Sequence, residues 1–432
     1  MKYLQLQKVC INPYTKMSKN ETIVFEQISD EEFVITKGST DCKRGRNKER
    51  DLLFPMKDWD NKLFFYNNQG FVAIDDVKRE DKIIEESGEF APIEDDTFKK
   101  LLDELIKLND EYFEETYSRS IKDISPDNIK KVQKTLIDLC DTKDQLSVSE
   151  FNNALLNIVW TYVPRRQNNL NKLVAHNQND FDDILAREQD VIDRLAQELL
   201  TATSANKKLD ILTANSIKER PCNKQELDYI ESLIAKGNNG RKYNLSRAWA
   251  VTNEKNEKAM NDYLRSEGFD ILPADEINFN RPGITYLWHG TAADNIWSIM
   301  KNGLYLNPAL IKANVEISGK AYGYGSYFAP CMYKSLGYVS GRFCVDRTIK
   351  KNGTYMLIFK VATGNPWYIY RDNNYVRPNH WEDFHQNHPG KHCCWAERGE
   401  ISPNADFRLR WDEVIVYQQC QSSLAYIVEI TE

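Results

Sequence analysis

Three short segments near the C-terminal end hold residue types that could do chemistry together. Residues 287–291 contain a Trp-His-Gly sequence, residues 319–329 are rich in glycine and tyrosine, and residues 411–417 place an Asp-Glu pair before a β-branched run. Glycines let a backbone approach a ligand closely, and tyrosines offer flat faces and hydroxyls. A histidine and a carboxylate add proton and charge chemistry. We therefore expect one ligand site built from all three segments.

The histidine and the carboxylates each allow a structural interpretation as well. His289 ends an apolar run and precedes Gly290, yet a lone histidine in this setting is more often structural. The tyrosine-rich segment is also compatible with a core hairpin. Glu413 and Asp412 are neighbours on an expected strand, so their side chains point to opposite faces. Only one of these two carboxylates can serve a given cleft.

The sequence offers no standard phosphate-binding loop. Neither a Walker-type loop nor a strand followed by a Gly-x-Gly-x-x-Gly turn is present. The sequence therefore does not support dinucleotide binding by a Rossmann-type fold. A nucleotide would have to be bound in another way.

Taken in order, the three segments resemble the poly(ADP-ribose) polymerase family, a branch of the ADP-ribosyltransferase fold marked by a His-Tyr-Glu triad. The match lies in a strand ending in Trp-His-Gly, a glycine-tyrosine segment ending in Tyr-Phe-Ala, and a near-terminal Glu-x-Ile-Val-Tyr strand. The resemblance implies NAD as substrate, with Glu413, His289 and Tyr327 as catalytic residues. Their combined order and spacing make it specific.

The resemblance assigns a role to each matching residue. Glu413 would bond the 2′-hydroxyl of the nicotinamide ribose and stabilise the developing cation, and His289 would bond the adenine-side ribose. Tyr327 would lie on one side of the nicotinamide ring. The remaining NAD contacts implied are Gly290, Thr291, Asn295, Lys334, Ser335 and Tyr338. No metal is required.

A histidine and cysteine cluster nevertheless raises the question of zinc. It comprises His385, His388, His392, Cys393 and Cys394. The spacing follows no standard ligand pattern, so we expect no metal site here.

The chain that positions these segments is predicted to fold into several domains. Residues 1–88 favour a small β module, 89–203 an all-α helical bundle, and 204–432 an α+β domain with a mostly antiparallel sheet. Helix starts are expected at Ser125-Pro126 and at Ser147, which pairs with Glu150 as a capping box. The resemblance implies that the bundle is a helical regulatory domain and the last part the ADP-ribosyltransferase domain.

The N-terminal module is expected to hold strands at Tyr3, Thr22, Phe33 and Lys62–Tyr66, with a further strand at Leu209 after the bundle. It occupies the place of the family's WGR domain but lacks a Trp-Gly-Arg triplet. A basic loop offers candidate contacts to damaged DNA, and a simple solvated loop is the alternative. Its residues are Lys43, Arg44, Arg46, Lys48 and Arg50.

Composition sets the remaining limits. The chain of 432 residues is 41% apolar, which supplies enough material for several folded cores. Its net charge of −7 gives no general attraction to nucleic acid. No apolar run reaches the length of a membrane span, and the N-terminal residues lack a signal core. Nine cysteines without a paired framework favour a reducing compartment, so we expect an intracellular protein, nuclear in a eukaryote and cytoplasmic in a bacterium.

The sequence therefore predicts an NAD-dependent poly- or oligo-ADP-ribosyltransferase that modifies proteins including itself and responds to DNA breaks. Three alternatives stay open. The first is a mono-ADP-ribosyltransferase, or a constitutively active transferase that modifies proteins or nucleic-acid ends without a DNA switch. The second is a catalytically idle NAD or ADP-ribose binding module, and the third a nucleic-acid adaptor led by the basic loop.

Overall fold

The computed structural model describes most of the chain and divides it into two units. Unit 1 comprises residues 1–84 and 111–200, and unit 2 comprises residues 85–110 and 201–432. The described residues are 2–11, 18–41, 50–74, 93, 95–118, 120–166, 173–200, 209–236, 243–269, 279–307, 310, 320–339, 354–369, 381–399 and 409–431. Within them, no helix is both long enough and apolar enough to span a bilayer.

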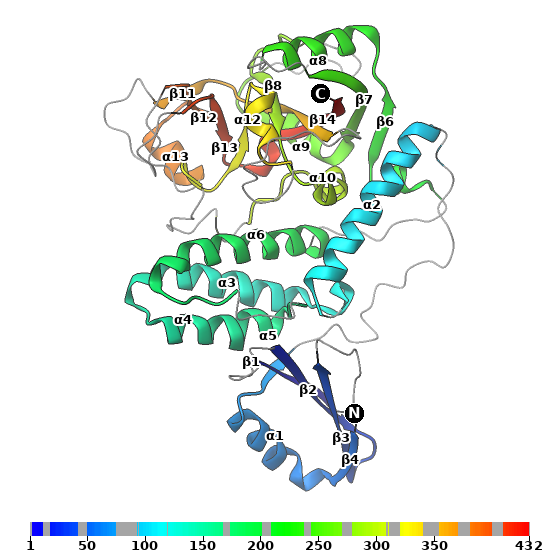
Figure 1. The fold of residues 1–432 in the computed structure, drawn as a ribbon, viewed down its shortest axis with the longest axis vertical. Coiled ribbons are helices and arrows are strands. Elements are labelled where there is room, and N and C mark those ends of the chain that lie inside the picture. The colour runs from blue at the N-terminus through cyan, green and yellow to red at the C-terminus, as the bar shows by residue number, and fades with distance from the viewer. Residues whose placement is uncertain are drawn as a thin grey trace. The chain divides into compact units, whose positions relative to one another are not determined.

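Unit 1 begins with an antiparallel sheet of five strands in the order β4-β3-β2-β1-β5. The strands are β1 (Tyr3–Ile11), β2 (Ser18–Gln27), β3 (Glu32–Asp41), β4 (Arg50–Pro55) and β5 (Val72–Ile74). Helix α1 (Trp59–Asn68) covers one face (Figure 1). The Phe25 ring lies in the core, 5.2 Å from the ring of Trp59 and 5.9 Å from that of Tyr66.

The predicted strand at Lys62–Tyr66 is wrong, because these residues belong to α1. Trp59 and Tyr66 are seven residues apart, so they lie on the same face of a helix and both are buried. Phe64 and Phe65 are 67% and 52% exposed. The run of apolar and aromatic residues favours a strand in the sequence, but only one side of it is buried, as in a surface helix. The other predicted strands of the module are present.

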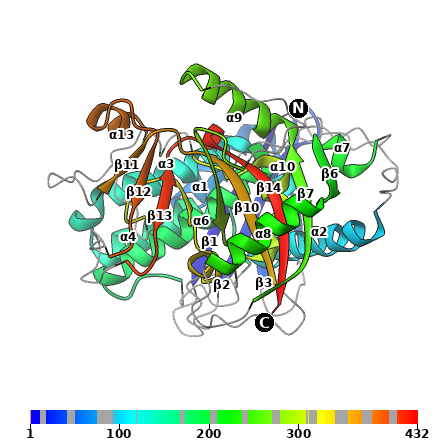
Figure 2. The same ribbon diagram turned by 90° about the horizontal axis from the view of Figure 1, so that it is seen from above.

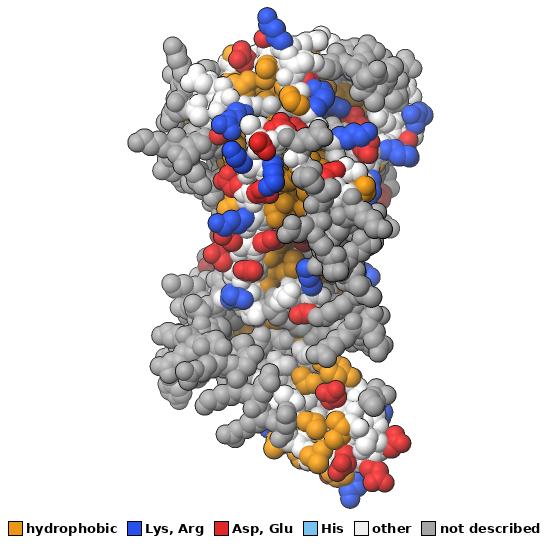
Figure 3. Space-filling model, turned by 90° about the vertical axis from the view of Figure 1, so that its right-hand side faces the viewer, with side chains coloured by type: hydrophobic (Ala, Val, Ile, Leu, Met, Phe, Trp, Pro, Cys, Tyr) orange, Lys and Arg blue, Asp and Glu red, His pale blue; other side chains and the backbone are white. Residues whose placement is uncertain are grey.

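The surface of this module carries several exposed apolar side chains. Among its described residues, six large apolar side chains are exposed: Tyr3, Ile28, Leu52, Leu53, Phe64 and Phe65. Figure 3 shows hydrophobic side chains gathered on one face of it, with acidic side chains nearby. The basic loop proposed for DNA contact lies outside the described residues, except for the backbone of Arg50 at the start of β4.

The rest of unit 1 is helical. Its elements are the end of α2 (Asp96–Thr116), α3 (Pro126–Thr142), α4 (Val148–Ala154), a π-helical turn η4 (Leu155–Val159), α5 (Trp160–Tyr162) and α6 (Phe181–Leu200). Both predicted helix starts are confirmed. Ser125 accepts a hydrogen bond from the Asn128 N–H, and Ser147 and Glu150 form a capping box. The helix of 160–162 ends two residues before Pro164, which cannot continue it.

Unit 2 contains two sheets (Figure 2). The larger is antiparallel, in the order β6-β7-β14-β10-β8, and the smaller has the order β11-β12-β13-β9 with one parallel pair, β11 and β12. The strands of the larger sheet are β6 (Ile217–Pro221), β7 (Asn244–Asn253), β8 (Ile284–His289), β10 (Thr354–Ala362) and β14 (Ser422–Thr431); those of the smaller are β9 (Ser326–Phe328), β11 (Pro366–Tyr368), β12 (Cys393–Ala396) and β13 (Glu413–Val416). The predicted mixture of helices and a mostly antiparallel sheet is confirmed.

Helices of unit 2 surround these sheets. They are α7 (Ile211–Ala214), α8 (Lys224–Lys236), α9 (Glu254–Ser266), α10 (Ile296–Asn302), α12 (Met332–Leu336) and α13 (Trp381–Asn387). The predicted strand at 209–212 is wrong: Asp210 accepts hydrogen bonds from the Leu212 and Thr213 N–H groups and begins α7. An aspartate with free backbone donors two and three residues ahead favours a helix start.

The first part of α2 belongs to the core of unit 2. Phe98, Leu101 and Leu105 pack in one buried cluster with Trp249 and Leu287. Residues 85–110 are thereby grouped with the C-terminal part of the chain, whereas the sequence placed residues 89–110 in the helical domain. The domain boundaries at 88 and 203 remain predictions.

Candidate active site

The candidate site forms where the two sheets of unit 2 meet. Trp288 in β8 and Ala329 after β9 exchange two backbone hydrogen bonds, of 2.8 and 3.0 Å. Strand β9 pairs with β13 through Tyr327 and Ile415. Three segments that are distant in sequence thus become neighbours, and they are the three segments singled out by their residue types.

His289 ends β8, as predicted. Its Nδ1 lies 3.0 Å from the carbonyl oxygen of Tyr327, and because a carbonyl only accepts, Nδ1 carries the proton. Burial lowers the pKa of His289 to about 4, and the nearby Lys320 lowers it further, while the Tyr327 carbonyl acts in the opposite direction. At neutral pH His289 is therefore an uncharged ring with its Nε2 unprotonated.

Tyr327 is held by its own segment. Its hydroxyl donates to the Gly323 carbonyl at 2.9 Å and accepts from the Tyr322 N–H, also at 2.9 Å. The ring is therefore fixed in place, and it is partly exposed. A fixed aromatic face suits stacking against a flat ligand.

The other two tyrosines of this segment are core residues. Tyr322 is fully buried and Tyr324 is 4% exposed. The Tyr324 hydroxyl accepts a hydrogen bond from the Asn307 N–H at 2.7 Å. The structural interpretation that the sequence left open therefore holds for both residues, and only Tyr327 faces a possible ligand.

Glu413 begins β13 and is 8% exposed. Its Oε1 lies 2.5 Å from Nζ of Lys334, which stands on the short helix α12. Burial by itself would lower the pKa of Lys334, but the charge and hydrogen bond of Glu413, together with those of Tyr338, outweigh burial and the pKa is raised. Lys334 is therefore an ammonium at neutral pH.

Asp412 has a different set of partners from Glu413. Its carboxylate accepts hydrogen bonds from Trp395 Nε1 at 3.0 Å and from the Arg398 N–H at 2.8 Å. These bonds give Asp412 a structural function, so Glu413 is the carboxylate available to the site.

Gly290 and Ser335 lie against each other. A Cβ added to Gly290 would be 1.8 Å from the Ser335 carbonyl oxygen, so only glycine fits. The Ser335 hydroxyl donates to the Trp288 carbonyl at 3.1 Å. The two residues predicted to contact one ligand group are thus brought together.

The remaining predicted contacts border this centre. Asn295 Nδ2 donates to Thr291 Oγ1 at 3.2 Å. The Tyr338 N–H donates to the Ser335 carbonyl at 3.0 Å, and Lys334 Nζ lies 5.7 Å from the Tyr338 ring centre. Tyr338 is 46% exposed, so its ring is accessible to a ligand.

Lys320 is a neighbour that the sequence analysis did not single out. Its Nζ lies 5.2 Å from the centre of the Tyr327 ring. The sequence does place this cation inside the glycine-tyrosine segment, directly after Gly319. The distance between Lys320 and the Tyr327 ring, however, depends on how the segment folds.

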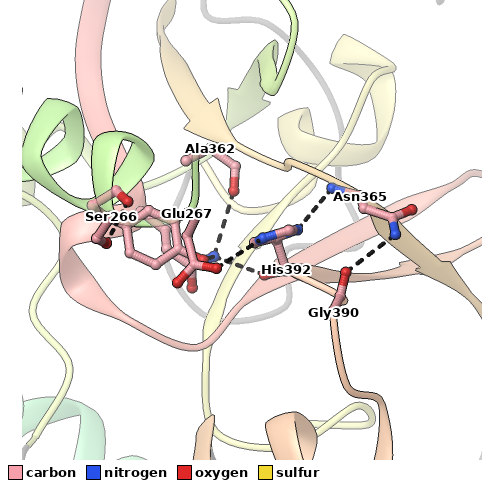
Figure 4. Close-up of polar contacts among 8 residues, drawn as sticks. Ser266, Glu267, Ala362, Asn365, Gly390 and His392 are labelled. Atoms are coloured by element: carbon pink, nitrogen blue, oxygen red, sulfur yellow. Dashed lines mark hydrogen bonds and ion pairs between the residues drawn. The ribbon is translucent and has the colours of Figure 1, made fainter. Parts of the chain in front are cut away.

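The histidines and cysteines considered for zinc are used in other ways. His392 accepts at Nδ1 from the Asn365 N–H, 2.9 Å away, and its Nε2 lies 3.2 Å from Glu267 Oε2 (Figure 4). His388 stacks on Trp367 with ring centres 3.7 Å apart. Burial raises the pKa of the Cys393 thiol and of the Cys394 thiol. Within the described ranges, no group of three His, Cys, Asp or Glu residues is placed to hold a metal ion.

Comparison with known proteins places the site in a recognised domain. Residues 224–431 match the poly(ADP-ribose) polymerase catalytic domain. A poly [ADP-ribose] polymerase-like protein, 100L, of Invertebrate iridescent virus 6 is 27% identical over 221 residues, which are 50% of this chain and 99% of the viral protein.

Two animal proteins show similar identity over shorter shares of their length. Protein mono-ADP-ribosyltransferase PARP3 of Gallus gallus is 27% identical over 48% of this chain and 36% of its own length. Poly [ADP-ribose] polymerase 1 of Caenorhabditis elegans is 26% identical over 41% of this chain and 20% of its own length. The chain thus spans about a third or less of each animal relative.

Proposed function

We propose that this chain, which carries a poly(ADP-ribose) polymerase catalytic domain and is an NAD-dependent ADP-ribosyltransferase, builds poly- or oligo-ADP-ribose on protein acceptors including itself. The supporting observation is the meeting of His289, Tyr327 and Glu413 across β8, β9 and β13.

The reaction transfers the ADP-ribosyl group, through its C1′ atom, from nicotinamide to an acceptor. The bond between C1′ and the nicotinamide nitrogen breaks, and its electron pair neutralises the ring as it leaves. C1′ then carries an oxocarbenium-like charge, which a nearby carboxylate stabilises. The acceptor atom attacks C1′, forms the new glycosidic bond and releases its proton to solvent. Such a reaction needs positioning and negative charge more than a strong acid.

Glu413 is the carboxylate that we assign to this step. Lys334 fixes one of its oxygens, which leaves the second oxygen for the 2′-hydroxyl of the nicotinamide ribose. His289, uncharged, would bond the adenine-side ribose through Nε2.

A second group of residues is assigned to the nicotinamide ring and its carboxamide. The backbone of Gly290 and the hydroxyl of Ser335 would bond its carboxamide. The rings of Tyr327 and Tyr338 would enclose the nicotinamide ring, and Thr291 with Asn295 would contact the nucleotide. These assignments follow the family resemblance.

We further propose that DNA breaks activate the enzyme through unit 1, inside the cell. The basic loop between β3 and β4 is the candidate contact. An alternative is mono-ADP-ribosylation without a DNA switch, which the similarity to the Gallus gallus mono-ADP-ribosyltransferase favours.

Labelled NAD distinguishes these functions. The full chain is incubated with it, with and without nicked or blunt-ended DNA, beside Glu413→Gln. A smear on a gel that depends on DNA supports a regulated polymerase. A sharp band that is indifferent to DNA supports mono-transfer, and labelling that persists in Glu413→Gln would overturn the assignment of Glu413.

A further inference from the structure

The site must bind a ligand with two negatively charged phosphates, and the triad itself offers no cation for them. His289 is uncharged at neutral pH, since its pKa is about 4. Glu413 is an anion and would repel phosphate. A pyrophosphate held by such residues alone would lose its solvation without compensation. The need for a cation at this position rests on the proposed NAD-binding function.

Lys334 does not meet this need. Its ammonium lies 2.5 Å from Glu413 Oε1 and 5.7 Å from the Tyr338 ring centre. The positive charge is therefore used on the nicotinamide side, where it neutralises the catalytic carboxylate. Moving Lys334 to a phosphate would leave Glu413 buried without its partner.

Lys320 has the position that Lys334 lacks. Its Nζ lies over Tyr327, 5.2 Å from the ring centre, and its charge acts on His289. Its backbone is fixed by a turn in which the Gly323 N–H donates to the Lys320 carbonyl at 3.0 Å. Lys320 is partly exposed, so its ammonium is accessible to a ligand. It thus lies over the residue assigned to the nicotinamide ring, and its charge acts on the residue assigned to the adenine-side ribose.

We propose that Lys320 binds the pyrophosphate of NAD and positions the dinucleotide between His289 and Tyr327. It is a binding residue and takes no part in bond breaking. An ammonium is a compact point charge that binds phosphate without demanding two fixed hydrogen bonds. Lys320 should therefore matter for ligands that carry the pyrophosphate, and be irrelevant to those that carry only the nicotinamide ring.

Two probes distinguish pyrophosphate binding from nicotinamide binding: ADP-ribose, which contains the pyrophosphate, and benzamide, which imitates the nicotinamide ring. Their dissociation constants are measured by calorimetry on the full chain, with the variants Lys320→Ala and Lys320→Arg. Lys301→Ala is a matched control, because Lys301 Nζ lies 5.2 Å from the Trp297 ring centre on α10.

Lys320→Ala should weaken ADP-ribose binding roughly 10- to 100-fold and reduce its dependence on salt. Benzamide binding should stay unchanged. Lys320→Arg should retain most of the ADP-ribose affinity, and Lys301→Ala all of it. In steady-state kinetics the KM for NAD should rise in Lys320→Ala while kcat changes little.

Two results would overturn the inference while leaving the enzyme assignment intact. One is unchanged ADP-ribose affinity in Lys320→Ala. The other is an equal loss of benzamide and ADP-ribose affinity that Lys320→Arg does not restore, which indicates a structural role for the side chain. If the wild-type chain binds neither probe and transfers no label from NAD, the proposed function fails and the inference with it.

Discussion

Lys334 Nζ lies 2.5 Å from Glu413 Oε1, and this ion pair joins helix α12 to strand β13. Both side chains are largely buried, at 24% and 11% exposure. The pair fixes the candidate catalytic carboxylate and balances its charge.

Replacing Glu413 by Gln should abolish most of the transfer activity. The substitution removes the negative charge with little change in shape, so the developing cation loses its stabiliser. We expect kcat to fall on the order of 100- to 1000-fold, with NAD affinity nearly unchanged. Asp412→Asn is the matched control, since Asp412 binds Trp395 and Arg398; an equal loss of kcat in both variants would contradict the assignment.

The pair itself can be measured by a double-mutant cycle. Lys334→Met, Glu413→Gln and the double variant are compared by denaturant unfolding. We expect a coupling free energy of about 0.5–3 kcal/mol. Because Glu413 raises the pKa of Lys334 above its usual 10.5, this contribution is complete below pH 10.5 and is lost only as pH rises through the higher, folded-state pKa. A coupling of zero at pH 7 would mean that the two charges act independently.

Gly290 should tolerate no side chain. In Gly290→Ala the new Cβ would meet the Ser335 carbonyl oxygen at 1.8 Å, so backbone must shift. We expect a loss of at least about 1–3 kcal/mol in the free energy of unfolding and a weaker affinity for benzamide. Gly38→Ala is the control, because its nearest neighbour would be Thr22 Cβ at 3.8 Å. Normal benzamide binding by Gly290→Ala would show that the pocket adapts.

Glu219 should make the stability of unit 2 depend on pH. Burial, aided by the charge of Asp95, raises its pKa to about 7. A carboxyl with a raised pKa favours the folded state when protonated, so its effect is absent below the unfolded pKa of about 4.5. Stability should decline as pH rises from there to about 7. Glu219→Gln should therefore raise Tm at pH 8 more than at pH 5; equal shifts at both values would contradict this.

Glu188 should be essential for the helices of unit 1. It is 2% exposed and accepts from Trp160 Nε1 at 2.9 Å and from Arg187 Nε at 3.0 Å. Glu188→Ala leaves these donors and Arg165 without their anion, so we expect about 3–5 kcal/mol of destabilisation. Asp182→Ala is the control, because the Asp182 side chain, paired with Lys143, is 54% exposed and such pairs contribute about 1 kcal/mol or less. Similar losses in both variants would show that burial of the network is unimportant.

Much of the candidate site could be predicted from the sequence because its elements are defined locally. His289 ends a strand, Glu413 begins one, and the caps at Ser125 and Ser147 use neighbouring residues. Such features depend on side chains within a few positions of one another. The errors had the same local origin: the aromatic run at 62–66 and the apolar run at 209–212 look like strands until their burial on one side and the Asp210 cap are known.

The sequence by itself determined which three segments matter and that their carboxylate, histidine and tyrosines belong to one chemistry. The tertiary structure decided which members face the site. In the folded chain, Tyr322 and Tyr324 are buried and Tyr327 stays accessible. Asp412 accepts a hydrogen bond from Trp395, whereas Glu413 pairs with Lys334. These outcomes depend on contacts between strands and helices that are dozens of residues apart. No local pattern specifies them, because each follows from how the two sheets of unit 2 meet and which side chains fill the space between them.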